Sequence, residues 1–109
     1  MRVAAVIGDL MLYSRIDAAA AAAGASLLRV DAPADLPADE PFDVVLVDWS
    51  AREPGWAHAL QSRTTSRVIL FGRHTDLEAH AAARAAGLGP MLARSKLISD
   101  LPGLFAVAG

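Results

Sequence analysis

Three short runs of apolar residues have the pattern of β-strands that are buried on both faces. They cover residues 3–7, 42–47 and 67–71. Each run is too short for a helix, and its apolar positions are nearly continuous rather than alternating. This pattern is typical of strands in a parallel sheet that helices cover on both sides. Two weaker runs, 26–30 and 90–93, are predicted to be edge strands.

Segments with helical spacing of apolar residues lie between these runs. Residues 10–23 carry such a stripe and precede Gly24, a residue type that commonly follows the end of a helix. Residues 56–60 predict a shorter helix. In contrast, residues 31–41 contain three prolines and leave room for only about one helical turn. A helix between the second and third strands is therefore predicted to be short or absent.

Two further helices are expected in the C-terminal part of the chain. Residues 76–86 are rich in alanine, and Thr75 and Glu78 have the spacing of a capping box at the start of this helix. A last short helix is expected to open at Ser99, which places Pro102 in its first turn, where proline is tolerated.

The alternation of strands and helices predicts a single α/β domain over residues 1–109. Alternation of this kind is typical of a parallel sheet with right-handed crossovers. The common order for five such strands is 2-1-3-4-5, which makes the first and third strands neighbours. Ligands of such doubly wound sheets bind at the carboxyl ends of the strands, where the winding reverses. Asp9 and Asp48 follow the first and third strands and are predicted to meet there.

Composition narrows the classes of function. The chain has 10 basic and 12 acidic side chains, a net charge of −2, and no cysteine. Nothing in this balance builds the positive field of a nucleic-acid-binding protein, and thiolate metal sites and disulfides are excluded. No apolar run approaches the ~20 residues of a membrane span, and the N-terminus does not have the pattern of a signal peptide. A cytoplasmic location, without membrane or nucleic-acid partners, is therefore expected.

Taken together, these residues resemble the receiver domain of bacterial response regulators, over the whole chain. Residues 44–48, Val-Val-Leu-Val-Asp, match the third strand of that family and its phosphoacceptor aspartate. Asp9 matches the second acid of the family's acidic pair, and Ser50 holds the position whose backbone carbonyl faces Mg²⁺. The resemblance implies a flavodoxin-like (CheY-like) five-stranded sheet. It also implies Asp48 as the candidate phosphoacceptor and a weak candidate Mg²⁺ site at Asp9, Asp48 and Ser50.

Several residues depart from the family's pattern. Gly8 replaces the first acid of the pair, and Gly72 stands where the family has a threonine or serine that senses the phosphoryl group. Arg94 takes the place of the family's lysine, and Lys96 lies two positions later. No residue of the sequence obviously replaces the missing hydroxyl. Phosphoryl transfer to aspartate needs a nucleophilic carboxylate, a metal, a cation and a hydroxyl, so the chain is interpreted as a degenerate receiver, or pseudo-receiver.

Each candidate residue at this site also has a structural role open to it. Asp48 could be a strand-end carboxylate that is paired with Arg94 or Arg73, and a guanidinium between two carboxylates would relieve their repulsion without metal. Asp9 could be the N-cap of the first helix. Trp49 could be an exposed partner contact or a cover for the edge of the core.

The resemblance also implies a partner surface. Receivers commonly dimerise or bind partners through the fourth helix, fifth strand and fifth helix. The corresponding interface candidates are Ala79, Ala83, Arg94 and Leu101.

Three functions remain open. The leading interpretation is a non-enzymatic, stand-alone receiver-like module that acts by contact with a protein partner, such as a histidine kinase or an effector, or with a second copy of itself. The second is a true phosphoacceptor that receives phosphate on Asp48 from a histidine kinase with Mg²⁺. The third is a flavodoxin-like domain that binds a small ligand at the same strand ends.

Overall fold

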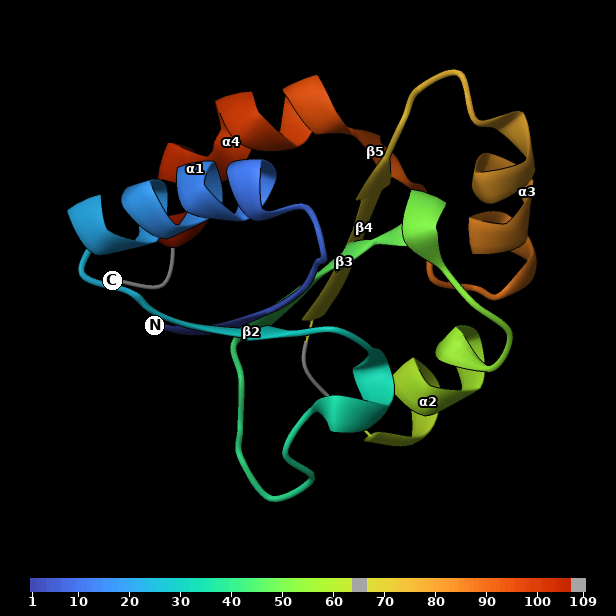
Figure 1. The fold of residues 1–109 in the computed structure, drawn as a ribbon, viewed down its shortest axis with the longest axis horizontal. Coiled ribbons are helices and arrows are strands. Elements are labelled where there is room, and N and C mark those ends of the chain that lie inside the picture. The colour runs from blue at the N-terminus through green and yellow to red at the C-terminus, as the bar shows by residue number, and fades with distance from the viewer. Residues whose placement is uncertain (64–66, 107–109) are drawn as a thin grey trace.

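Five parallel strands form one sheet in the order β2-β1-β3-β4-β5, as predicted (Figure 1). The computed structural model describes residues 1–63 and 67–106. Residues 64–66 and 107–109 of the predicted domain lie outside the described residues. The order confirms a flavodoxin-like, doubly wound α/β fold. The strands are β1 (Arg2–Val6), β2 (Ser26–Val30), β3 (Val44–Asp48), β4 (Arg67–Gly72) and β5 (Leu92–Ala93).

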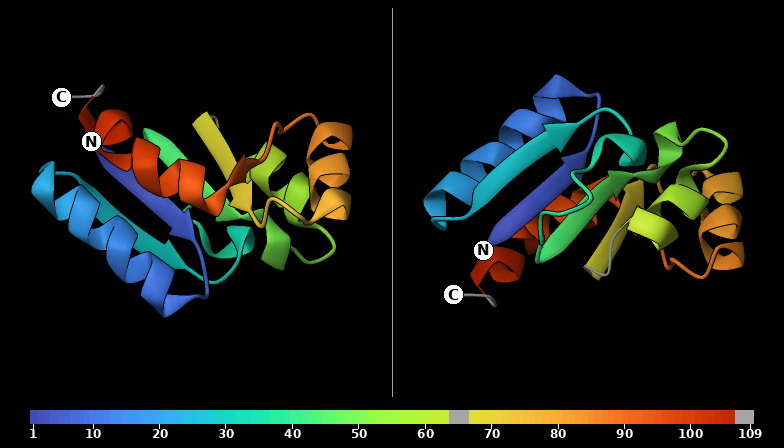
Figure 2. Two further views of the ribbon diagram at one scale, coloured as in Figure 1. Left: turned by 90° about the horizontal axis from the view of Figure 1, so that it is seen from above. Right: turned by 90° about the horizontal axis from the view of Figure 1, so that it is seen from below.

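Helices cover both faces of this sheet (Figure 2). On one face, α1 (Leu10–Ala22) and α4 (Arg94–Ala106) contact each other and pack on the sheet. The other face is covered by the 3₁₀ turn η1 (Pro33–Asp35), α2 (Trp56–Arg63) and α3 (Leu77–Ala85). A second 3₁₀ turn, η2 (Trp49–Ala51), follows β3 directly. Among the described residues, no helix has the length and apolar character that crossing a membrane requires.

The central strand β3 explains the continuous apolar pattern. All five of its residues are buried, because helices cover both of its faces and strands lie on both of its edges. Its neighbour β1 runs in register with it, so that Val6 lies beside Val47. The two strands therefore end at the same edge of the sheet, and the residues that follow them meet there.

The segment between β2 and β3 has the short element that its prolines predict. Only the three residues of η1 are helical there, and Pro33 is the first of them. The helix labelled α2 lies after β3, so a full helix between β2 and β3 is missing from the fold. Leu36 and Phe42 from this segment are buried and fill the space against the sheet and α2.

The start of the last helix differs from the prediction. It begins at Arg94 rather than at Ser99, and Pro102 lies well inside it. Proline lacks an N–H and usually ends or bends a helix, which is why the pattern favoured a later start. Burial of Leu97, Leu101 and Phe105, spaced four residues apart, outweighs the lost hydrogen bond and keeps the helix continuous.

The cap of α3 also differs from the prediction. Asp76, and not Thr75, is the N-cap residue, and its Oδ1 accepts a hydrogen bond from the Ala79 N–H at 3.0 Å. Aspartate caps a helix at least as well as threonine, so the neighbouring residue in the loop decides the boundary.

Candidate functional site

Asp9 lies in the loop that leaves β1 and begins α1. Its Oδ1 accepts hydrogen bonds from the backbone N–H groups of Met11 and Leu12, at 3.1 and 3.2 Å. Asp9 is thus the N-cap of α1, the structural role left open by the sequence. One carboxylate oxygen is committed to the helix, and Oδ2 faces the edge of the sheet.

Asp48 is the last residue of β3 and the only polar or charged residue that is buried among those described. Its carboxylate makes no capping hydrogen bond to η2, although it occupies the N-cap position. Its Oδ1 is buried and has no hydrogen-bond partner among the described residues. The side chain therefore depends on a partner for Oδ2.

Arg94 provides that partner and reaches both aspartates. Its Nη2 lies 3.1 Å from Asp48 Oδ2, and its Nη1 lies 3.5 Å from Asp9 Oδ2. The side chain of Arg94 is 37% exposed, whereas that of Asp48 is 5% exposed. Arg94 follows β5 directly, and this position at the sheet edge aims the guanidinium between the two strand ends. We call Asp9, Asp48 and Arg94 the rim triad.

The rim triad matches one of the arrangements that the sequence left open. A guanidinium lies between the two carboxylates, and of Arg94 and Arg73 it is Arg94 that supplies it. Arg73 instead lies in the loop after β4 and is exposed.

The electrostatics of the triad follow from burial. Burial raises the pKa of Asp48 above its ordinary value, because the charged form loses its hydration. The Arg94 guanidinium opposes this rise through its charge and its hydrogen bond, whereas the charge of Asp9 adds to it. The ionised carboxylate of Asp48 is thus held in place by Arg94 at a cost in folding free energy.

Replacing Asp48 with asparagine is expected to raise the free energy of unfolding at pH 7. Because the folded-state pKa lies above the ordinary 3.8, the folded chain binds more protons than the unfolded chain between these two values. The contribution of Asp48 to stability therefore falls as the pH rises through this interval. Urea unfolding of both proteins, from about pH 4 to pH 8, should show a stability gain for Asp48→Asn that grows with pH and then becomes constant. A variant less stable than the parent at pH 7 would contradict this.

The rim triad does not fit a resident Mg²⁺ ion. Mg²⁺ needs near-octahedral oxygen coordination, usually with one or two carboxylates and several waters. The guanidinium of Arg94 lies between the two carboxylates and would repel a second cation. Asp9 Oδ1 is committed to capping α1, and Gly8 offers no carboxylate. The described residues contain no group of three or more acids or histidines with metal-binding geometry.

Ser50 was expected to offer its backbone carbonyl to a metal, and its side chain makes a separate contact. It lies in η2, and its Oγ accepts a hydrogen bond from the Arg73 N–H at 3.0 Å. A β-carbon on Gly72 would collide with this oxygen. A hydroxyl therefore lies against position 72, and it comes from η2, after β3, rather than from β4. Sequence alone carries no signal for this, since the two residues are 22 positions apart. The expectation that no residue replaces the missing hydroxyl in its role toward a phosphoryl group stays a prediction.

Trp49 directly follows Asp48 of the rim triad and packs in the core. It is 2% exposed and packs in the core beneath η1, α2 and α3, so it covers the core rather than offering a contact. Arg52 lies over its ring at 5.7 Å, and Arg52 Nη1 donates to the Trp49 carbonyl at 3.2 Å. Arg52 was not recognised from the sequence, because only the turn of η2 brings its side chain back over Trp49.

The predicted interface residues lie mostly inside the molecule. Ala79 and Ala83 are fully buried residues of α3, and Leu101, a residue of α4, is 2% exposed. This corrects their assignment as surface candidates: apolar residues at helical spacing line the core here. Arg94 remains accessible, as part of the rim triad.

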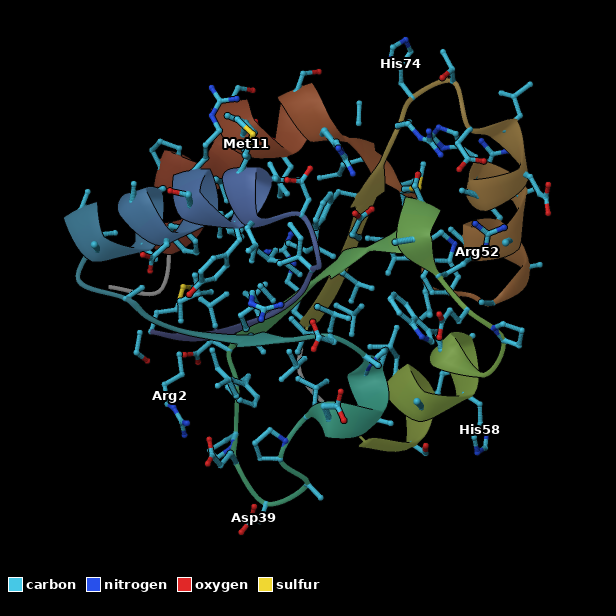
Figure 3. The ribbon with its side chains drawn as sticks, in the orientation of Figure 1. Arg2, Met11, Asp39, Arg52, His58 and His74 are labelled. Carbon is cyan, nitrogen blue, oxygen red and sulfur yellow. The ribbon has the colours of Figure 1, made fainter. Side chains whose placement is uncertain are left out.

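Exposed apolar side chains occur instead at the start of α1. Leu10 is 63% exposed and Met11 is 83% exposed, and Met11 projects outward from the helix (Figure 3). Both line a groove of about 940 Å³ between the N-terminal turns of α1 and α4, together with Ile98. Asp9 and Arg94 lie along the same groove, so an apolar surface borders the rim triad.

Comparison with known proteins identifies a similar fold. The structure is similar to the crystal structure of a response regulator from Hahella chejuensis, with a TM-score of 0.72 over 98% of this chain and 90% of that chain. The two sequences are 13% identical, so the similarity is one of fold. No protein-family model matches the chain, and no curated protein matches it.

Proposed function

We propose that this chain is a receiver-like signalling module that acts by protein–protein contact, without efficient phosphorylation. One observation carries the proposal: the guanidinium of Arg94 reaches both Asp9 and Asp48 at the edge where a receiver would hold its metal and phosphoryl group. The module carries its own cation at this edge. Its two carboxylates are thus bridged by a guanidinium of the chain itself, without any ligand.

The chemistry of the rim supports this proposal. A nucleophilic carboxylate must be free to attack, and a metal and a hydroxyl must stabilise the transferred group. Here Asp48 Oδ2 is bound by Arg94, Gly8 and Gly72 carry no functional group, and the Ser50 hydroxyl is engaged by Arg73. Arg94 also differs from a lysine, since a planar guanidinium can bind two carboxylates at once.

One observation favours the alternative of a phosphoacceptor. Asp48 Oδ1 has no hydrogen-bond partner among the described residues, whereas Oδ2 is paired with Arg94. Oδ1 is buried, however, and a phosphodonor would have to displace neighbouring atoms in order to reach it. We therefore rank phosphorylation of Asp48 second.

A contact surface for the proposed function borders the rim. Large apolar side chains that protrude together into solvent are typical of interaction sites. Leu10 and Met11 protrude beside an apolar groove that also includes Asp9 and Arg94. A protein partner bound there would contact the rim triad and the apolar pair at once. The same groove would serve the third function, binding of a small ligand.

Titration with Mg²⁺, with and without beryllofluoride, tests the proposal. Trp49 directly follows Asp48 and is buried, so its fluorescence should report a change at the rim. Replacing Trp56 with phenylalanine leaves Trp49 as the only tryptophan. We expect no saturable change in Trp49 fluorescence, because Arg94 already occupies the space between the carboxylates.

The same titration on Asp48→Asn in the Trp56→Phe background is the control. A saturable response in the parent that is absent from this control would favour the phosphoacceptor and overturn the proposal.

A further inference from the structure

Ser50 and Gly72 share one small volume between the ends of β3 and β4. Gly72 is the last residue of β4 and is buried. A β-carbon there would collide with Ser50 Oγ and would lie 2.9 Å from Met91 Sδ. Real β-carbons do not approach other atoms so closely. The Ser50 hydroxyl therefore fits in its place because residue 72 has no β-carbon.

The Ser50 hydroxyl uses this volume to hold the loop between β4 and α3. Its Oγ accepts a hydrogen bond from the Arg73 N–H at 3.0 Å. Asp76, at the other end of the loop, caps α3 through the Ala79 N–H. Within the loop, the Asp76 N–H donates a hydrogen bond to the Arg73 carbonyl at 3.0 Å. The Ser50 hydroxyl thus holds the loop at Arg73, and Arg73 is bonded in turn to Asp76, the cap of α3.

We propose that Ser50 is a positioning residue that couples the end of β3 to the start of α3, with its hydroxyl in the place that Gly72 leaves open. The coupling rests on the proposed function, because it describes how a change at the rim triad reaches another face of the module. It does not require a metal or a phosphoryl group.

The turn η2 gives this coupling a physical path. Asp48 and Ser50 are two residues apart, and the residue between them, Trp49, is packed in the core. Arg52 donates to the Trp49 carbonyl and lies over its ring, which fixes the turn as a unit. A shift of Asp48 toward or away from Arg94 would therefore move Ser50, and Ser50 would move the Arg73 amide and Asp76 with it.

Amide hydrogen exchange tests the contact. In Ser50→Ala, the Arg73 amide should exchange about fivefold faster, because its hydrogen-bond partner is gone. Ser62→Ala is the matched control, since Ser62 is exposed and, within the described part of the chain, its Oγ bonds to carbonyls of its own helix, α2. Unchanged exchange of Arg73 in Ser50→Ala would remove the basis of the proposal.

Amide chemical shifts test the coupling in metal-free buffer without a phosphodonor. Replacing Asp48 with asparagine should shift the Ala79 amide, and the size of this shift should be at least roughly halved in the Ser50→Ala background. A purely structural role for Ser50 would leave the two responses equal, and that result would overturn the proposal. The beryllofluoride titration tests a different property, so the two proposals can fail separately.

Swapping the residue types at positions 50 and 72 tests whether the two residues compete for one volume. This test does not require that Ser50→Ala folds. Gly72→Ser alone should be less stable than the double variant Ser50→Gly/Gly72→Ser, because the single variant forces a β-carbon against Ser50 Oγ. Equal stability of the two variants would show that residues 50 and 72 do not compete for one space.

Discussion

Replacement of Arg94 with alanine is expected to lower the free energy of unfolding by about 2–3 kcal/mol, as measured by urea unfolding at pH 7. The reason is the environment of Asp48, whose side chain is 5% exposed and has Arg94 as its ion-pair partner. Removing one partner of a buried pair leaves an uncompensated charge, which costs more than the pair contributes. Because Arg94 is 37% exposed, the expected loss in the free energy of unfolding is smaller than for a fully buried pair.

Arg15→Ala is the matched control for this result. Arg15 is exposed on α1 and has no ion pair among the described residues, so its loss should change stability by less than about 0.5 kcal/mol. The double variant Arg94→Ala/Asp48→Asn should recover most of the lost stability, because the unpaired charge is then gone. Mg²⁺ should raise the unfolding midpoint of Arg94→Ala but not that of the parent. An Arg94→Ala protein as stable as the parent would show that Arg94 does not compensate the buried charge of Asp48.

Replacement of Leu101 with alanine is expected to lower the free energy of unfolding by about 2–5 kcal/mol. Leu101 is 2% exposed and packs with Leu97 and Phe105 between α4 and the sheet. Truncating such a side chain removes its burial and leaves a cavity. Thermal or urea unfolding of the monomer measures the loss.

Leu77→Ala carries the same chemical change at an exposed position, since Leu77 is 77% exposed at the start of α3. Its effect should stay within about 0.5 kcal/mol. The pair separates the two roles considered for Leu101. A residue of a partner interface would leave the stability of the monomer nearly unchanged, and that outcome would contradict its assignment to the core.

The sequence predicted the strands of the sheet well for a physical reason. Strands covered on both faces must be apolar at nearly every position, so 3–7 and 42–47 could be recognised without any partner. The prolines of 31–41 likewise predicted a short η1, because proline limits a helix locally. The winding of the sheet then brought Asp9 and Asp48 to one edge.

Predictions that depended on packing were less successful. The start of α4 at Arg94 rather than Ser99 reflects burial of Leu97, which no local rule for Pro102 contains. Ala79 and Ala83 could have lined either the core or a partner surface, because helical spacing alone does not show what a stripe packs against. The structure places them in the core.

By itself, the sequence determined the positions of the central strands, the aspartates that end two of them and the absence of the first acid and of a β4 hydroxyl, because these depend on local pattern. With the common order of such sheets, it also predicted that the two aspartates meet at one edge. Tertiary structure alone decided what surrounds the aspartates. It selected Arg94 over Arg73 as their cation, and it placed the hydroxyl of Ser50 against Gly72. Both contacts join residues that lie at or just after the ends of different strands, and their distances depend on how the strands pack together rather than on any spacing along the chain.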